Sequence, residues 1–184
     1  MRMLHRGVPP IFGLLGTVLL LAAGPAPEPA QSAEKLISVR VEKVLLVNEQ
    51  PAVVLANEQE HQYLLVFVDQ FMAQSIQMGL LDLAIERPLT HDLIGILLRR
   101  LGAEVTRVTI TELRDSTYFA MITLRSNGGV QEIDARPSDA LAIAVRLKAP
   151  VFAARGLMSN RLFPEGGPPQ QLLKEDPGTT KQGA

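Results

Sequence analysis

The stretch that most constrains the fold is a helix that must be buried on most of its sides. Residues 133–150 spell IDARPSDALAIAVRLKAP, and in the second half nearly every position is Ala, Leu, Ile or Val. On a helix, Asp139, Ala142 and Arg146 follow one another at i, i+3 and i+7 and form a single polar stripe. Such a helix needs cover from other elements over most of its surface.

The start of this helix carries its own signals. Pro137 suits the first helical position, where its missing N–H would have no partner in any case. Ser138 or Asp139 is expected to accept hydrogen bonds from the free backbone N–H groups, and the helix dipole favours the negative charge of Asp139 there.

Strand patterns and helix patterns alternate along the rest of the chain. Apolar and polar residues alternate, or β-forming residues cluster, in segments bounded by turn residues, and NGG at 127–129 is a strong hairpin signal. Two further helices are expected, one from Asp69 to Met78 with Gly79 as a stop, the other capped by Thr90 and closed by Gly102. The expected strands are 36–47, one that follows a turn within 48–57, 61–69, 104–113, 117–126, 130–136 and a short one at 150–154.

This order predicts the fold class. Three strands, two helices, three strands, a helix and a short strand indicate a single compact α+β domain of mostly antiparallel sheet over residues 35–162. Hydrophobic residues make up 47% of the chain, which is enough for a core.

Both ends of the chain are predicted to lie outside that domain. Basic residues precede an apolar run of 13 residues, IFGLLGTVLLLAA, and a Pro/Ala linker follows it, so residues 1–33 are interpreted as a signal peptide and linker with cleavage after Ser32 or Ala33. The alternatives are an uncleaved membrane anchor and a buried core helix, although a bilayer span needs roughly 20 residues. The protein is therefore expected to be periplasmic or extracellular, or membrane-anchored if uncleaved. Residues 163–184 are polar and rich in Pro and Gly, which predicts a disordered tail.

Composition excludes several classes of site. The chain has no Cys, which rules out disulfides, a thiol nucleophile and Cys-based zinc sites. A formal net charge of -1 argues against a strongly basic protein held on nucleic acid by counterion release. Phosphate-binding, hydrolase and metalloprotease motifs are absent, and aromatic residues are only 4% of the chain, unlike an RNA-reading sheet.

The polar residues around the central helix form a candidate site. In the strand before it, Glu132, Asp134 and Arg136 share one face, and the polar stripe of the helix continues that line. His91 and Asp92 begin another helix, where His91 is a candidate general base. Oxygen ligands suit Mg²⁺ or Mn²⁺, and a metal together with an Arg suits phosphodiester chemistry. The candidate metal ligands are Asp92, Asp134 and Asp139, and the candidate catalytic residues are His91, Asp92, Asp134, Arg136, Ser138 and Asp139.

A structural explanation of the same residues stays open. An Asp at a helix start is usually a cap, and an Arg beside two Asp residues is usually their ion-pair partner. A lone His at a helix start is more often partly buried than catalytic. The segment LRDST at 113–117 is most simply a turn, although Arg114 and Asp115 could face a cleft.

Four segments together resemble a known family. DQFMAQSI, RPLTHDL, VTRVTITELRDSTYFAMITLRS and IDARPSDALAIAVRLKAPVF occur in this order in the bifunctional nuclease (BFN) family, over about residues 36–158. The resemblance implies a compact α+β domain, often oligomeric, with nuclease activity on DNA and RNA in some members. The positions that match the family pattern are Arg87, Pro88, Thr90, His91, Asp92, Leu113, Asp115, Asp134, Arg136, Pro137, Ser138 and Asp139.

The sequence departs from the family pattern in two places. Asp69 stands where the family has Gly, and Met72 stands where it has Glu. The leader peptide is the second departure. Two hypotheses follow. One is a metal-assisted nuclease that acts on nucleic acid, for which the resemblance implies a homo-oligomer. The other is a non-catalytic envelope module for binding or assembly with the same fold.

Overall fold

The structure is a computed structural model that describes residues 35–83 and 85–163. The predicted signal peptide and linker and the predicted C-terminal tail from residue 164 onward lie outside the described residues. Within the described ranges, no helix combines the length and the apolar character needed to cross a membrane.

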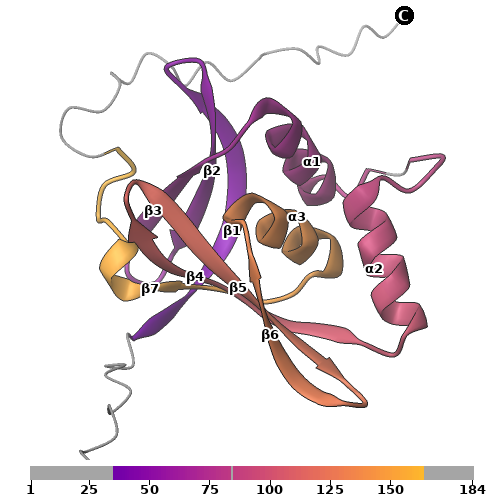
Figure 1. The fold of residues 1–184 in the computed structure, drawn as a ribbon. Coiled ribbons are helices and arrows are strands. Elements are labelled where there is room, and N and C mark those ends of the chain that lie inside the picture. The colour runs from indigo at the N-terminus through magenta and orange to yellow at the C-terminus, as the bar shows by residue number, and fades with distance from the viewer. Residues whose placement is uncertain (1–34, 84, 164–184) are drawn as a thin grey trace, which may run out of the picture. The chain divides into compact units, whose positions relative to one another are not determined.

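A seven-stranded sheet forms the frame of the domain (Figure 1). The strand order is β3-β2-β1-β7-β4-β5-β6, and every neighbouring pair is antiparallel except β4 and β7. The predicted α+β class with a mostly antiparallel sheet is confirmed. The strands are β1 (Leu36–Val47), β2 (Gln50–Asn57), β3 (Gln62–Phe67), β4 (Glu104–Arg114), β5 (Thr117–Ser126), β6 (Gly129–Ala135) and β7 (Val151–Ala154).

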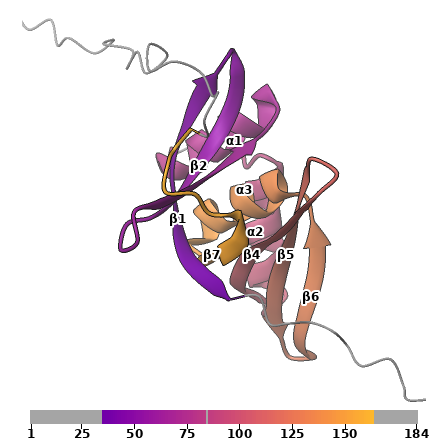
Figure 2. The ribbon, with the colours of Figure 1, turned by 90° about the vertical axis from the view of Figure 1, so that its left-hand side faces the viewer.

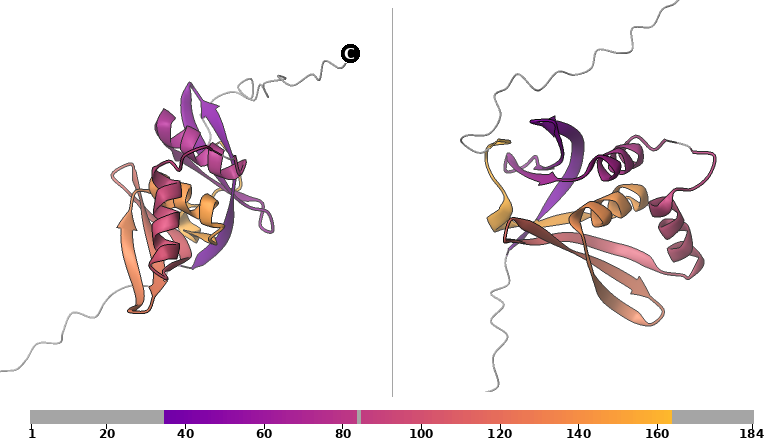
Figure 3. Two further views of the ribbon diagram at one scale, coloured as in Figure 1. Left: turned by 90° about the vertical axis from the view of Figure 1, so that its right-hand side faces the viewer. Right: turned by 45° about the horizontal axis from the view of Figure 1, so that its top comes forward.

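Three α-helices of the described chain lie on one side of this sheet, as two opposite views show (Figures 2 and 3). They are α1 (Gln70–Leu80), α2 (Thr90–Arg100) and α3 (Pro137–Leu147). Helix α3 packs against α1, α2, β4 and β5, and residues 140–144 are all buried. The nearly all-apolar sequence of α3 is therefore explained by its place at the centre of the domain.

Tight turns connect the hairpins. Asn48 and Glu49 join β1 to β2, and Asp115 and Ser116 join β4 to β5; all four have positive φ. Two-residue loops of this kind match the right-handed twist of the flanking strands. The predicted turn within LRDST is confirmed.

Helix α1 differs from its prediction at the C-terminal end. Asp69 is the N-cap, and its Oδ1 accepts the Met72 N–H at 2.9 Å. Gly79 was expected to stop the helix, which is wrong, because α1 continues to Leu80. A Cβ atom on Gly79 would lie 2.6 Å from Cγ2 of Val145, so this glycine lets α1 approach α3 closely.

Helix α2 starts one residue earlier than predicted. Leu89, not Thr90, occupies the N-cap position, and the Asp92 carboxylate accepts the Leu89 N–H at 3.0 Å. The predicted stop at Gly102 is confirmed: its φ is +65°, and the N–H of Ala103 reaches the Leu98 carbonyl at 2.9 Å.

The apolar face of α2 points partly to solvent. Leu93, Leu97 and Leu101 are exposed, whereas His91 and Gly95 are buried. A Cβ on Gly95 would lie 2.9 Å from Cδ2 of Leu147, so the small and polar side of α2 packs on α3. Helical spacing predicts that Leu93, Leu97 and Leu101 share a face, but not that this face is left open.

Candidate functional site

The predicted site residues are divided between two pockets. His91 and Asp92 line a pocket of about 150 Å³ between α1, α2 and the end of α3, here called the α2 pocket. Asp134, Arg136 and Ser138 line a pocket of about 420 Å³ at the start of α3, here called the α3 pocket. Asp139 lies between them, because its carboxylate contacts both His91 and Arg136.

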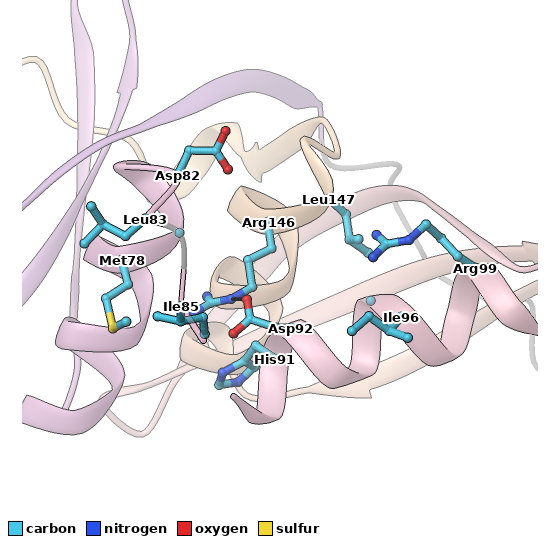
Figure 4. Close-up of a pocket in the computed structure, with 12 residues that line it drawn as sticks. Met78, Asp82, Leu83, Ile85, His91, Asp92, Ile96, Arg99, Arg146 and Leu147 are labelled. Atoms are coloured by element: carbon cyan, nitrogen blue, oxygen red, sulfur yellow. Dashed lines mark hydrogen bonds and ion pairs between the residues drawn. The ribbon is translucent and has the colours of Figure 1, made fainter. Parts of the chain in front are cut away.

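Asp92 is held by an ion pair in the α2 pocket. Its Oδ1 is 2.6 Å from Nε of Arg146, whose side chain is only 8% exposed (Figure 4). Arg146 also donates to the Ala142 carbonyl at 3.0 Å. With its second oxygen accepting the Leu89 N–H, Asp92 has both carboxylate oxygens engaged. The ion pair between Asp92 and Arg146 therefore joins α2 to α3.

His91 has a partner at each ring nitrogen. Nδ1 is 3.0 Å from Oγ of Ser75, and Nε2 is 3.4 Å from Oδ1 of Asp139. An ionised carboxylate only accepts, so Nε2 carries the proton, and in the neutral ring Nδ1 accepts from Ser75. The three side chains come from α1, α2 and α3. Ser75 was not predicted, because a single serine inside a helix carries no sequence signal.

Asp139 forms a two-pronged ion pair with Arg136. Nε of Arg136 lies 2.6 Å from Oδ2, and Nη2 lies 3.1 Å from Oδ1. The Arg136 hydrogen bonds, with a smaller contribution from His91, lower the pKa of Asp139 below its ordinary value, against the raising effect of burial. The expectation that Ser138 or Asp139 caps α3 is wrong: the N-cap is Arg136 and makes no side-chain cap bond, while Pro137 is at the helix start as predicted.

Of the three carboxylates predicted as metal ligands, the one in the α3 pocket has the fewest partners. Asp134 is exposed and forms no hydrogen bond or ion pair with the described residues. Asp69 lines the same pocket and uses one oxygen to cap α1. The Arg136 side chain is 69% exposed, and the pKa of Arg136 is raised by Asp139 and, to a smaller extent, by Asp69. Carboxylates, a guanidinium and a helix N-terminus therefore meet at one opening.

The three predicted metal ligands are not gathered in one cluster. Asp92 is paired with Arg146 and Asp139 with Arg136, while Asp134 lies in the α3 pocket. Residues 35–83 and 85–163 contain no group of three or more acidic, His or Cys side chains placed to hold a metal ion. Within the α3 pocket, Asp69 and Asp134 are the carboxylates that line it.

The structure also places the two residues of the folded part that depart from the family pattern. Met72 is buried in the core, so position 72 faces away from solvent. Asp69 instead adds its charge to the α3 pocket. Phe119 also lines the pocket, and Arg114 lies over its ring, 4.4 Å from the centroid.

Comparison with known proteins gives a consistent result. A family described as the bifunctional nuclease domain matches residues 53–165. A Mycobacterium tuberculosis (strain ATCC 25618 / H37Rv) protein, "Uncharacterized protein Rv1829", is 30% identical over 125 residues, covering 68% of this chain and 73% of the relative. Bifunctional nuclease 1 of Arabidopsis thaliana is 32% identical over 105 residues, covering 55% of this chain and 32% of the relative. Bifunctional nuclease 2 of Oryza sativa subsp. japonica is 33% identical over 112 residues, covering 59% of this chain and 34% of the relative.

Proposed function

The chain belongs to the bifunctional nuclease domain family, and from that premise we propose that it hydrolyses phosphodiester bonds of DNA, RNA or both at the α3 pocket. The matches cover only about a third of each plant nuclease, 32% and 34% of their lengths. The proposal therefore concerns this domain and its own residues.

The observation that carries the proposal is the combination of groups at the start of α3. Arg136 offers an exposed guanidinium, which suits a phosphate oxygen and the charge that develops there during attack. The N-terminus of α3, where Pro137 and Ser138 line the pocket, adds a favourable dipole for an anion. Asp134 brings a carboxylate that can orient or deprotonate a water molecule.

A divalent cation fits this set of charges. Asp69 and Asp134 would repel a phosphodiester entering the pocket, and Mg²⁺ or Mn²⁺ held by these carboxylates would remove that repulsion. Mg²⁺ sites commonly use one or two protein carboxylates and complete their coordination with water and substrate phosphate. When bound, the ion would supply Lewis acidity and lower the pKa of a coordinated water.

The remaining predicted residues support the site by holding it in place. Asp139 fixes the guanidinium of Arg136, and His91 and Ser75 fix Asp139. His91 is not available as a direct base while both nitrogens are engaged, so its proposed role is positioning. Asp92, paired with the buried Arg146, sets how α2 packs on α3.

The test is a cleavage assay with purified protein. Single-stranded and double-stranded DNA and RNA are incubated with Mg²⁺, Mn²⁺ or EDTA, and the products are separated by gel electrophoresis. Cleavage that requires the metal and is lost in Asp134→Asn supports the proposal. Equal cleavage by wild type and Asp134→Asn would identify a contaminating nuclease and contradict it.

The alternative function, an assembly module, is favoured by one observation. Leu89, Leu93, Leu97 and Leu101 are all exposed and follow each other at intervals of four along α2. We propose a second copy of this chain as the partner. Two α2 helices packed antiparallel about a two-fold axis would join these stripes and place the C-terminal end of one helix beside the N-terminal end of the other. This pairing is compatible with catalysis at the α3 pocket.

A further inference from the structure

The α3 pocket gathers aromatic side chains in a chain that has few. Two of the six Phe residues, Phe67 and Phe119, and one of the two Tyr residues, Tyr118, line it. Phe67 ends β3, whereas Tyr118 and Phe119 begin β5, and β3 and β5 are far apart in the strand order. The sheet must therefore curve to bring its two halves to one pocket.

These aromatic residues are at least partly exposed to solvent, so a ligand can reach them. Phe67 is 45% exposed, and Tyr118 and Phe119 are partly exposed. The Tyr118 hydroxyl is protonated at neutral pH and can donate a hydrogen bond, and burial raises its pKa further above neutrality. The guanidinium of Arg114 lies over one face of the Phe119 ring, 4.4 Å from its centroid. Ser116 of the β4–β5 turn and Thr117 at the start of β5 lie along the same lining.

We propose that the α3 pocket is a stacking subsite for one unpaired nucleobase, next to the phosphate bound at Arg136. The inference rests on the proposed nuclease function and specifies its substrate as single-stranded. A volume of about 420 Å³ is that of a small-molecule site, with room for one base and not for a duplex. Aromatic rings accept any base by its flat face, so the subsite selects for an unpaired base with little sequence preference.

The aromatic residues lie in the same pocket as Arg136, which fixes where the base and the phosphate of a bound nucleotide would lie. Tyr118 and Phe119 line the pocket with Asp134 and Arg136, and as consecutive residues of β5 they project to opposite faces of the sheet, so a nucleotide whose phosphate meets the Arg136 guanidinium would have its base beside one of the two rings. A base in a duplex is paired and stacked, and it would have to flip out of the helix to enter. Duplex nucleic acid is therefore expected to bind less tightly than a single strand of the same length.

The test separates base stacking from phosphate binding. Fluorescence anisotropy measures binding of a labelled oligothymidylate, an abasic oligonucleotide of the same length and a duplex, with Ca²⁺ present and the oligonucleotides verified as uncleaved. Wild-type protein is expected to bind oligothymidylate about tenfold or more tightly than the abasic strand. Phe67→Ala and Tyr118→Leu should remove this difference and leave abasic binding unchanged.

Phe71→Ala is the matched control, because Phe71 is 83% exposed and lies outside the pocket lining. It should behave as wild type. Equal wild-type affinity for the base-containing and abasic strands, an absence of binding, or an equal loss on both strands in the pocket variants would overturn the subsite. Base-dependent binding without any metal-dependent cleavage would retain the subsite and refute the nuclease proposal. Metal-dependent cleavage without base-dependent binding would retain the nuclease proposal and refute the subsite.

Discussion

The carboxylate of Asp92 and the guanidinium of Arg146 form a largely buried ion pair between α2 and α3. Oδ1 and Nε are 2.6 Å apart, and the Arg146 side chain is 8% exposed. A buried charge that keeps its partner is tolerated, whereas one that loses its partner is strongly destabilising. The family-matched Asp92 therefore has a structural role that can be measured separately from catalysis.

Asp92→Ala should lower the free energy of unfolding by about 3 kcal/mol, because it leaves the Arg146 charge buried without a partner. Urea denaturation measures this loss. Adding Arg146→Met should restore much of the stability, since both charges are then gone. Asp82→Asn is the control, because Asp82 is 88% exposed, its contact with Lys148 spans 3.8 Å, and Asn tolerates the positive φ of this position. A stable Asp92→Ala protein would contradict the assignment.

Asp134→Asn should abolish metal-dependent cleavage while leaving the melting temperature close to that of wild type. Asp134 is exposed and has no partner among the described side chains, so its loss breaks no contact. Asp115→Asn is the matched control on the β4–β5 turn, where Asn also tolerates a positive φ. Cleavage assays and thermal unfolding on the same preparations check both parts. An unfolded Asp134→Asn protein would instead indicate a structural role.

Asp139 should make the protein sensitive to acid. Its folded pKa is lowered, first by Arg136, so its contribution to stability is fully present above the unfolded value of about 3.8 and is lost as the pH falls through the lowered pKa. Wild type should therefore exceed Asp139→Asn in stability at about pH 7, and the gap should narrow below about pH 4. Urea denaturation curves of both proteins, recorded from about pH 7 to below about pH 4, measure this difference in stability. A gap independent of pH would show that the Asp139 charge does not matter.

Gly79→Ala and Gly95→Ala should each destabilise the helix layer. A Cβ would meet Val145 at 2.6 Å in the first case and Leu147 at 2.9 Å in the second, and overpacking of this kind costs about 1 to 3 kcal/mol. Better helix propensity offsets about 1 kcal/mol of that. Gly128→Ala is the control, since its new Cβ would have only an ordinary contact at 3.8 Å from Ser126. Unchanged melting temperatures for Gly79→Ala and Gly95→Ala would refute the close approach.

Leu97→Glu should convert a dimer to a monomer if α2 pairs with α2 of a second copy. The substitution places a charge in the centre of the exposed stripe without disturbing the core. Light scattering after size-exclusion chromatography gives the mass. Leu113→Glu is the matched control, an exposed leucine on β4. A wild-type monomer, or a dimer that survives Leu97→Glu, would exclude this interface.

Much of the fold is encoded in short stretches of sequence. Alternating residues, the turn at Asp115 and Ser116, the glycine at Gly102 and the apolar run of α3 predict strands, hairpins and helices, because backbone sterics and side-chain periodicity act over a few residues. Asp134, Arg136 and Ser138 were likewise predicted together, since they are neighbours along the chain.

Contacts between distant segments were decided only by the tertiary structure. The curvature of the sheet brings Phe67 to Tyr118, and the docking of helices directs Asp92 to Arg146 and divides one predicted polar patch into two pockets. The sequence around Gly79 resembles the end of a helix. In the structure, Gly79 instead lies inside α1 and packs against α3. Such outcomes depend on how whole elements pack against each other, and no local pattern specifies which side chain, some 50 residues away, will be the partner.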